Sequence, residues 1–215
     1  MTDDAIAEWV RTKPVDLVVM TTHGRGPVNR FGIARLGIEL ARHGPVPVLA
    51  VRPREAAEDF NFKPTVKRML IPLDGSELAE GVLEPAIALG SLMGAEYTLL
   101  RAVEPSSFLD GLAAAADPCA IERAREERRA EAQAYLDLLA ERLGVRGKCV
   151  KTEVVLCESA TAAILTAACA QNVDLISIAT HGRSGLRRLF LGSVARKIAR
   201  GTSTPVLVYR PRAGG

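Results

Sequence analysis

Hydrophobic residues along the chain form short uninterrupted runs, and the stretches between the runs carry apolar positions three and four residues apart. Short apolar runs are typical of strands buried on both faces, whereas the second spacing is typical of amphipathic helices. The runs predict strands at residues 16–21, 48–51, 68–73, 96–103, 149–157, 174–179 and 205–210. The helical spacing predicts helices at residues 3–11, 76–93, 119–143, 160–171 and 185–200. Strands that alternate with helices favour an α/β protein built on a parallel sheet.

Two of the predicted helices carry features that bear on their shape and surroundings. Pro85 lies inside helix 76–93, so we expect a kink or a late start there. In helix 119–143 an apolar stripe faces inward, and a mixed-sign charged face is expected to be solvated and to need no ligand. The stripe consists of Ala132, Leu136, Leu139 and Leu143, and the charged face of Arg123, Arg125, Glu126, Glu127, Arg128 and Arg129.

A sequence pattern near the start of the chain returns near its end. His23 and His181 align at an offset of 158 residues (181 − 23), and each is followed by a glycine. The same offset aligns Asp16 with Asp174, Pro47 with Pro205, Arg52 with Arg210, and Pro53 with Pro211. Such self-similarity indicates an internal repeat. The first copy is incomplete, because it has its last two strands and helices but lacks the leading half of the second copy.

The repeat divides the chain into three parts. Residues 1–53 are the partial first copy. Residues 54–67 have no clear period and are bracketed by prolines, which is typical of a linker. Residues 68–212 form the complete second copy, in which strands and helices are predicted to alternate from a first strand to a fifth.

A glycine-containing turn follows the strand predicted at residues 174–179. His181 and Gly182 end the strand, and Gly192 and Ser193 follow after nine further residues. Backbone N–H groups at such a turn and at a helix start bind anions. A turn that only reverses the chain would show the same glycines, so the motif alone leaves both interpretations open.

These residues resemble those of the universal stress proteins. Members of that family that bind ATP carry Gly-x-x-Gly, nine residues and then Gly-Ser or Gly-Thr after the fourth strand, and an aspartate after the first strand. The corresponding positions here hold Ala179, Gly182, Gly192 and Ser193, and Asp74 follows the first strand of the complete copy. Alanine replaces the first glycine of the pattern. The resemblance covers nearly the whole chain and points to the tandem members of the family, with the first domain truncated.

The resemblance implies an α/β fold with an open, parallel, five-stranded sheet in the order 3-2-1-4-5, helices on both faces, and the partial copy before it. With this order, ligands collect outside the carboxyl ends of the first and fourth strands. The resemblance also implies that the last strands of the two copies, at residues 48–51 and 206–209, pair antiparallel within the chain. The strand at residues 16–21 would then keep an exposed edge, so we expect a homodimer or a larger assembly through it.

The family's nucleotide site implies a set of binding residues at this crevice. Asp74 is expected to reach a ribose or the adenine edge, and Ser193 to offer a hydroxyl and an N–H to phosphate, although each could instead serve only its own turn. The full set is Pro72, Leu73, Asp74, Ala102, Val103, Ile178, Ala179, His181, Gly182, Arg183, Gly192, Ser193 and Val194. The implied cofactor is ATP, with or without Mg²⁺, and no catalytic or metal-ligating residue is predicted. Ala34 and Arg35 replace the glycine and the serine in the first copy, so one ATP per chain is expected.

Three functions stay open. The first is an ATP-binding regulatory module of the stress response, whose occupancy changes assembly or partner affinity. The second is a slow ATPase; fast hydrolysis is not predicted, because the chain has no Gly-x-x-x-x-Gly-Lys-Ser/Thr loop and no lysine beside the glycines. The third is a stress-associated interaction protein that binds no nucleotide, a branch of the family favoured by Ala179.

Composition narrows the class of partner and the compartment. The chain has 215 residues, with 28 basic against 25 acidic residues and a net charge of +3, and aromatic residues make up only 4%. This composition supplies neither a strong basic field nor stacking platforms, so nucleic acid is not an expected partner. The four cysteines form no Cys-x-x-Cys pair, and no apolar run reaches the length of a membrane span. The N-terminus does not read as a signal peptide, so we expect a cytoplasmic protein.

Overall fold

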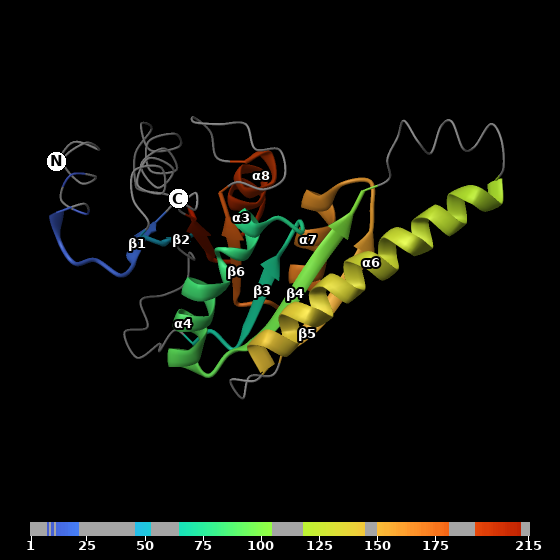
Figure 1. Cartoon of the computed structure of the whole chain (residues 1–215). Helices are drawn as coiled ribbons and strands as arrows, with labels where there is room; N and C mark the ends of the chain where they lie inside the picture. The colour runs from blue at the N-terminus through green and yellow to red at the C-terminus, as the bar shows by residue number, and fades with distance from the viewer. Residues whose placement is uncertain are drawn as a thin grey trace.

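One sheet forms the centre of the described structure (Figure 1). The computed structural model describes residues 8, 10, 12–21, 46–52, 65–104, 118–144, 150–180 and 192–211. These residues contain seven strands: β1 Val18–Thr21, β2 Val48–Val51, β3 Arg68–Pro72, β4 Glu96–Val103, β5 Val150–Leu156, β6 Leu175–Ala179 and β7 Val206–Tyr209. Their order across the sheet is β1-β2-β7-β6-β3-β4-β5. Neighbouring strands are parallel except β2 and β7, which are antiparallel.

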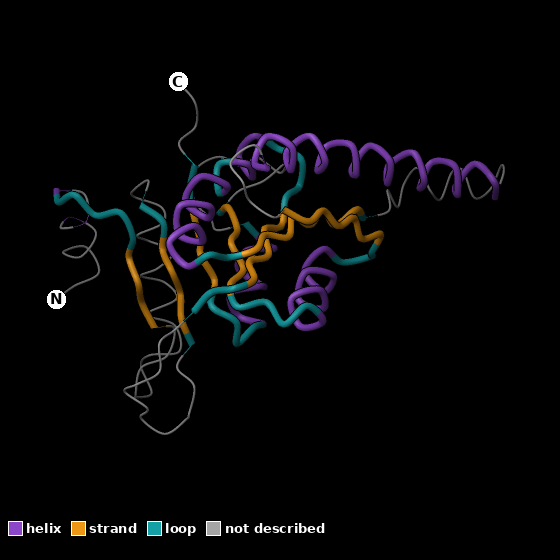
Figure 2. Tube along the Cα trace, turned by 90° about the horizontal axis from the view of Figure 1, so that it is seen from below, coloured by secondary structure: helices purple, strands orange, loops and turns teal. Residues whose placement is uncertain are grey.

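Helices cover both faces of this sheet (Figure 2). The helices are α3 Glu77–Glu80, α4 Leu83–Met93, α6 Pro118–Gly144, α7 Ala160–Ala170 and α8 Ser193–Gly201. Successive side chains of a strand point to opposite faces. Leu99 of β4 therefore packs in a core cluster with residues of α3, α4 and α6, whereas Leu100 packs with residues of α7 and α8. The result is a hydrophobic core on each face of the sheet.

The α/β class and the mostly parallel sheet are confirmed. The predicted sheet of five strands is replaced by one of seven, because β2 pairs along the outer edge of β7 and brings β1 with it. The strands contributed by residues 65–211 stand in the order β5-β4-β3-β6-β7. The antiparallel pairing predicted for the two last strands is observed: Val48 pairs with Val208, Leu49 with Leu207, and Ala50 with Val206.

The helix predicted at residues 76–93 is broken, as its proline indicated. α3 ends at Glu80, and α4 begins at Leu83 after the residues Gly81 and Val82. Pro85 lies in the first turn of α4, where its missing N–H removes no hydrogen bond within the helix. The expected kink or late start takes the form of an interruption: a first helix begins at Glu77, and a second begins at Leu83, two residues before Pro85.

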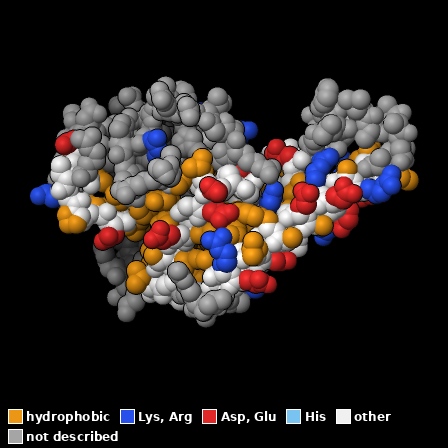
Figure 3. Space-filling view, viewed as in Figure 1, with side chains coloured by type: hydrophobic (Ala, Val, Ile, Leu, Met, Phe, Trp, Pro, Cys, Tyr) orange, Lys and Arg blue, Asp and Glu red, His pale blue; other side chains and the backbone are white. Residues whose placement is uncertain are grey.

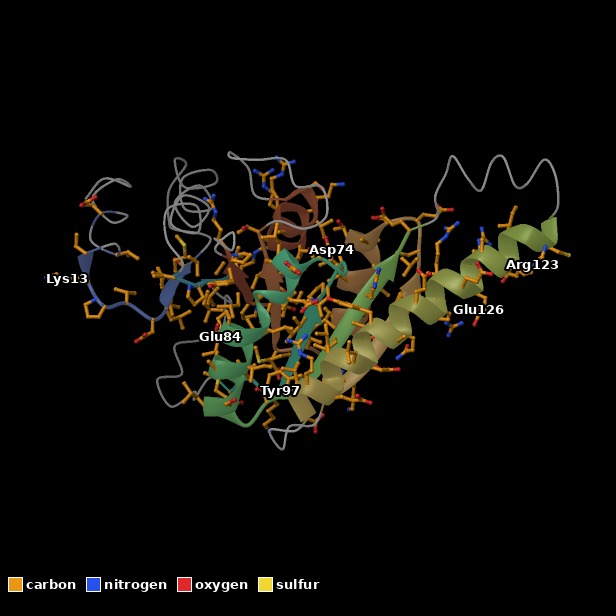
Figure 4. All side chains as sticks on the ribbon, in the orientation of Figure 1. Lys13, Asp74, Glu84, Tyr97, Arg123 and Glu126 are labelled. Carbon is orange, nitrogen blue, oxygen red and sulfur yellow. The ribbon has the colours of Figure 1, made fainter. Side chains whose placement is uncertain are left out.

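α6 extends beyond the edge of the sheet, and its outer part carries Arg123 and Glu126 (Figures 1 and 4). It has 27 residues and hence a length of about 40 Å. Ala132, Leu136 and Leu139 are buried, which confirms that part of the predicted apolar stripe. On the face of α6 that Figure 3 shows, acidic and basic side chains are interspersed. Within the part of the chain that the structure describes, no helix combines the length and the apolar character that crossing a membrane would require.

Asp174 holds the start of β3 beside β6. Its Oδ2 accepts hydrogen bonds from the backbone N–H groups of Lys67 and Arg68, each at 2.9 Å. Two backbone donors that converge on one carboxylate fix where β3 enters the sheet. The register of β3 against its neighbours then determines where its opposite end, with Asp74, is placed.

Some predictions fall outside the described residues. The helix predicted at residues 3–11 is described only at residues 8 and 10, and the linker predicted at residues 54–67 only from residue 65 onward. The helix predicted at residues 185–200 is described from Gly192, and α8 begins at Ser193. The division into a partial copy, a linker and a complete copy stays a prediction.

Candidate functional site

A cavity of about 540 Å³ opens at the carboxyl ends of β3, β4 and β6. Figure 4 shows Asp74 at that end of β3, beside α3. The predicted site residues that line this cavity are Pro72, Leu73, Asp74, Ala102, Val103, Ile178, Ala179, Gly192, Ser193 and Val194. The other three, His181, Gly182 and Arg183, lie outside the described residues. The structure thus brings residues from four separate segments to one cavity, and their role in binding stays a prediction.

The turn after β3 forms one wall of the cavity. Oδ1 of Asp74 accepts hydrogen bonds from the Ser76 backbone N–H at 3.0 Å and from the Ser76 hydroxyl at 2.6 Å. The Ser76 Oγ accepts the N–H of Ala79 at 3.1 Å and so caps α3. Gly75 has a φ of 82°, a conformation that residues with a Cβ rarely adopt. The turn therefore fixes the orientation of the Asp74 carboxylate.

Arg101 of β4 lies across this turn. Its guanidinium is 3.0 Å from the point where a Cβ on Gly75 would stand. Its Cζ is 5.0 Å from the centre of the Tyr135 ring on α6, a distance at which a cation interacts favourably with an aromatic face. Because Gly75 has no side chain, the Arg101 guanidinium can occupy the space beside it. Arg101 thereby places a positive charge in the wall of the cavity.

Tyr135 supports this arginine as a neutral phenol. Burial, followed by the charge of the neighbouring Glu80 carboxylate, raises the pKa of Tyr135 well above its usual value of 10.0. Glu80 is also 3.6 Å from Arg142, measured from Oε2 to Nη1. Arg101 therefore stacks on an uncharged ring at every pH at which the protein would normally function.

The start of α8 forms the facing wall. Gly192 is the N-cap of this helix, and its N–H donates to the carbonyl oxygen of Thr180 at 2.6 Å. A Cβ on Gly192 would stand 2.8 Å from that oxygen, closer than real Cβ atoms approach a backbone carbonyl. The close approach at Gly192 is thus to Thr180, and the N–H groups of Ser193 and Val194 are the ones that the helix start presents to the cavity.

No described side chain caps α8, and its first turn has no acidic residue. A helix start carries several N–H groups without a partner inside the helix, together with the positive end of the helix dipole. Both features favour a negatively charged group at this wall of the cavity.

Several cavity residues were not predicted from the sequence. Arg101, Arg128 and Glu131 add charge to the cavity wall. The face of α6 predicted to be solvated is exposed at Arg123, Arg125, Glu126, Glu127 and Arg129, whereas Arg128 is half-buried beside the cavity. Arg128 and Glu131 precede Tyr135 by seven and four residues, so they lie on the same side of α6 and point toward the end of β4. This spacing in the sequence could have indicated that Arg128 and Glu131 line the cavity only if it had been known that Tyr135 faces the cavity.

Glu104 lines the cavity but has a structural partner. Its Oε1 accepts the N–H of Ala160 at 2.7 Å and thereby caps α7. Burial, assisted by the negative charge of Glu104, raises the pKa of the nearby Cys157 thiol, and a hydrogen bond from the Ser159 backbone opposes this only in part. Cys157 is therefore a poor nucleophile.

The cavity lies where the chain leaves neighbouring parallel strands toward opposite faces of the sheet. β3 and β6 are adjacent, and the segment after β3 leads to α3 on one face, whereas α8 lies on the other. Open α/β sheets bind ligands outside the strand ends at such a switch point. Among the described residues, no group of three or more histidine, cysteine, aspartate or glutamate side chains is arranged to hold a metal ion. The fold is that of an open-sheet α/β protein, and one wall of the crevice at its switch point, the start of α8, favours a negatively charged group.

The chain belongs to the universal stress protein family, whose model matches residues 1–52 and 65–210. Universal stress protein YxiE of Bacillus subtilis is 30% identical over 148 residues, which cover 66% of this chain and 98% of that protein. A universal stress protein of Mycolicibacterium smegmatis is 28% identical over 204 residues, covering 94% of this chain and 64% of the relative. The chain therefore spans less than two thirds of the length of that longer relative.

Solved structures extend the likeness of the fold to the whole chain. A universal stress protein from Archaeoglobus fulgidus matches 99% of this chain and 66% of its own chain, with a TM-score of 0.65 and 18% identity. A universal stress protein in complex with cAMP matches 68% of this chain and 98% of its own, with a TM-score of 0.50 and 19% identity. At these identities the likeness concerns the fold alone.

Proposed function

We propose that this chain is an ATP-binding regulatory module of the stress response, whose nucleotide occupancy modulates assembly or partner binding. One observation carries the proposal: Asp74 and the uncapped start of α8 line the same cavity at the switch point of the sheet. A volume of about 540 Å³ falls within the usual range for small-molecule sites. Membership of the universal stress protein family supports the same assignment.

The two walls of the cavity, the start of α8 and the turn after β3, would bind different parts of the nucleotide. The N–H groups of Ser193 and Val194 and the Ser193 hydroxyl suit the phosphates, because they offer donors and the positive end of the helix dipole. Asp74 suits hydroxyl or amine donors, so it would hold the ribose or the adenine edge. Ile164 and Ile178 are almost fully buried and give the apolar surface on which a base could lie. When Mg²⁺ accompanies ATP, the phosphates would supply most of its ligands.

The alanine that replaces the first motif glycine fits this proposal. Ala179 is 7% exposed and packs in the core cluster that also contains Leu73 and Ala79. Its methyl group therefore contributes to the core beside α3, and the residue also lines the cavity. The same substitution remains the best argument for the second candidate, an interaction protein of this family that binds no nucleotide.

Isothermal calorimetry with ATP tests the proposal directly. We expect one ATP per chain, bound through the residues of the complete copy. Denaturing the purified protein and measuring an absorbance excess at 260 nm would reveal nucleotide carried through purification. The absence of binding to the wild-type chain would favour the second candidate, and turnover in the presence of Mg²⁺ would add slow ATP hydrolysis.

We also propose self-association through the outer edge of β1. Among the described strands β1 pairs only with β2, and Val19 in its middle is 60% exposed. An edge strand presents unpaired N–H and C=O groups that another strand can pair with. A second copy of this chain carries the same edge and is the proposed occupant.

A further inference from the structure

α8 connects the cavity to the first segment of the chain. Its N-terminal residues, from Gly192 to Ala195, line the cavity. At its other end, the carbonyl oxygen of Arg200 accepts a hydrogen bond of 3.2 Å from Nη2 of Arg52. Arg52 directly follows β2, so it belongs to the segment before the predicted linker. A helix of nine residues, about 13 Å long, thus joins two regions that are far apart in the sequence.

The two ends of α8 differ in what their own sequence supplies. The last turn carries Arg200, whose charge suits the negative end of the helix dipole. No described side chain caps the N-terminus of α8, and its first turn has no acidic residue. Helices this short are marginal unless tertiary contacts hold them. A guanidinium at the C-terminus interacts favourably with the negative end of the helix dipole, and an anion at the N-terminus with the positive end. The two partners would therefore stabilise the same helix.

The position of Arg52 is itself well determined. β2 pairs antiparallel with β7, with Leu49 opposite Leu207, and this pairing sets where the chain leaves β2. The Arg52 side chain is half-buried, and its Nε finds no hydrogen-bond partner among the described residues. Among the described residues, the hydrogen bond to the Arg200 carbonyl oxygen ties this guanidinium to α8.

A second connection runs through the strand end. The Thr180 N–H donates to the Tyr209 carbonyl oxygen of β7 at 2.8 Å, and the Thr180 carbonyl accepts the Gly192 N–H. The start of α8 is therefore tied to the same strand that pairs with β2. One end of α8 is thus linked to β7, and the other to the residue that follows β2.

We infer that Arg52 is a positioning residue for the nucleotide cavity: by stabilising α8 at its C-terminus, the first segment raises the affinity of the N-terminus for phosphate. The coupling is reciprocal, so a bound nucleotide stabilises the attachment of β2 to β7. This inference rests on the proposed function, and it names α8 as the element through which the first segment would regulate nucleotide affinity. Whatever displaces the first segment from β7 would also lower nucleotide affinity.

The first test compares ATP affinity among three variants by calorimetry. Arg52→Ala should weaken ATP binding about fivefold, a coupling of ordinary size. Arg52→Lys retains the charge at the end of α8 and should restore most of the affinity. Lys151→Ala is the matched control, because it removes a surface cation 3.4 Å from Glu96 at the opposite end of the sheet; it should leave the affinity unchanged. Equal affinities for Arg52→Ala and the wild type would overturn the inference while the proposed function stands.

The second test uses hydrogen exchange and needs no ligand. Arg52→Ala should speed the exchange of the amides of residues 196–201 about fivefold, because their hydrogen bonds depend on an intact α8. The amides of α4 serve as the internal reference and should not change. Unchanged exchange in α8, or an equal increase in α4, would overturn the inference even if the wild type bound no nucleotide.

A separate measurement with ATP bound tests the reciprocal coupling: the wild-type amides of β2 should then exchange more slowly.

Discussion

The strand pairs β1–β2 and β6–β7 have the same internal geometry and different surroundings. Val18 pairs with Val48 in the first and Ile176 with Val206 in the second, the same register at the offset of 158 residues (176 − 18). Even the hydrogen bond that precedes each pair recurs: Val18 N–H to Pro47 carbonyl and Ile176 N–H to Pro205 carbonyl, both 3.0 Å. Of the two equivalent strands β1 and β6, only β6 has a second described neighbour, β3, and every residue of β6 is buried. The cavity described above lies beside β6 and takes part of its lining from the end of β3, including Asp74.

The largest expected effect concerns the glycine at the start of α8. Gly192→Val would place a branched side chain where even a Cβ is 2.8 Å from the Thr180 carbonyl. The start of α8 would shift, so we expect ATP affinity to fall by about a hundredfold or more, the loss of one to two charge-assisted hydrogen bonds. Calorimetry measures the loss.

The matched control for this change is Ala34→Gly, which creates the corresponding glycine in the first segment. Ala34 lies outside the described residues, and the sequence predicts that ATP binding and its stoichiometry stay unchanged. Normal ATP binding by Gly192→Val, or two equivalent sites in the wild type, would contradict the assignment of one site to the complete copy.

The next effect concerns the aspartates before β6 and β1. Asp174→Ala removes the acceptor of two backbone N–H groups, so the free energy of unfolding should fall by about 2 kcal/mol. Asp16 holds the corresponding place before β1, where the structure describes no equivalent of β3, and Asp16→Ala should change stability by less than about 0.5 kcal/mol. Urea denaturation of the two variants gives both values. Equal losses would show that β1 has a similar partner after all.

A smaller effect, of opposite sign, is expected at a buried serine. Ser177 in β6 is fully buried, and its hydroxyl has no hydrogen-bond partner among the described residues. Ser177→Ala removes that unsatisfied group and should raise the free energy of unfolding by up to about 1 kcal/mol. A loss of stability in urea denaturation would indicate that the hydroxyl has a partner in solution.

The equivalent position in β1 is Val19, and a change there should affect assembly more than stability. Val19 is 60% exposed, so Val19→Lys should alter stability by less than about 0.5 kcal/mol. A lysine on an edge strand opposes pairing with another strand. We expect light scattering to show a smaller species for the variant than for the wild type. A wild type that is a monodisperse monomer at micromolar concentration would contradict self-association through β1.

The parts of the fold that the sequence predicted well are those with local signals. The apolar run at Glu96–Val103 matches β4 at both ends, and Pro85 indicated that the helix predicted at residues 76–93 would not be regular throughout. The number of strands in the sheet was missed, although the pairing of β2 with β7 was predicted. Nothing local in a sequence says that an edge pairing will join two sheets into one.

The site shows the same division between local and distant signals. The strand-end residues, such as Asp74 and Gly192, could be placed because each ends or begins an element. Arg101 and Arg128 could not be placed, since their position in the cavity depends on how α6 crosses the end of β4. The partner of the Gly192 N–H also escaped prediction, because the Thr180 carbonyl lies across a segment of the chain whose path the sequence does not reveal.

The pairing of β2 with β7 is symmetric about Leu49 and Leu207, which are themselves separated by 158 residues (207 − 49). Val48 faces Val208 and Ala50 faces Val206, so the two strands pair with an approximate two-fold symmetry in which alanine replaces one valine. Interfaces of this two-fold kind usually join separate subunits and dissociate on dilution. Here both halves belong to one chain, and the contact forms within the molecule at an effective concentration that does not depend on how much protein is present. The outer edge of β7 is therefore covered by β2 at any protein concentration.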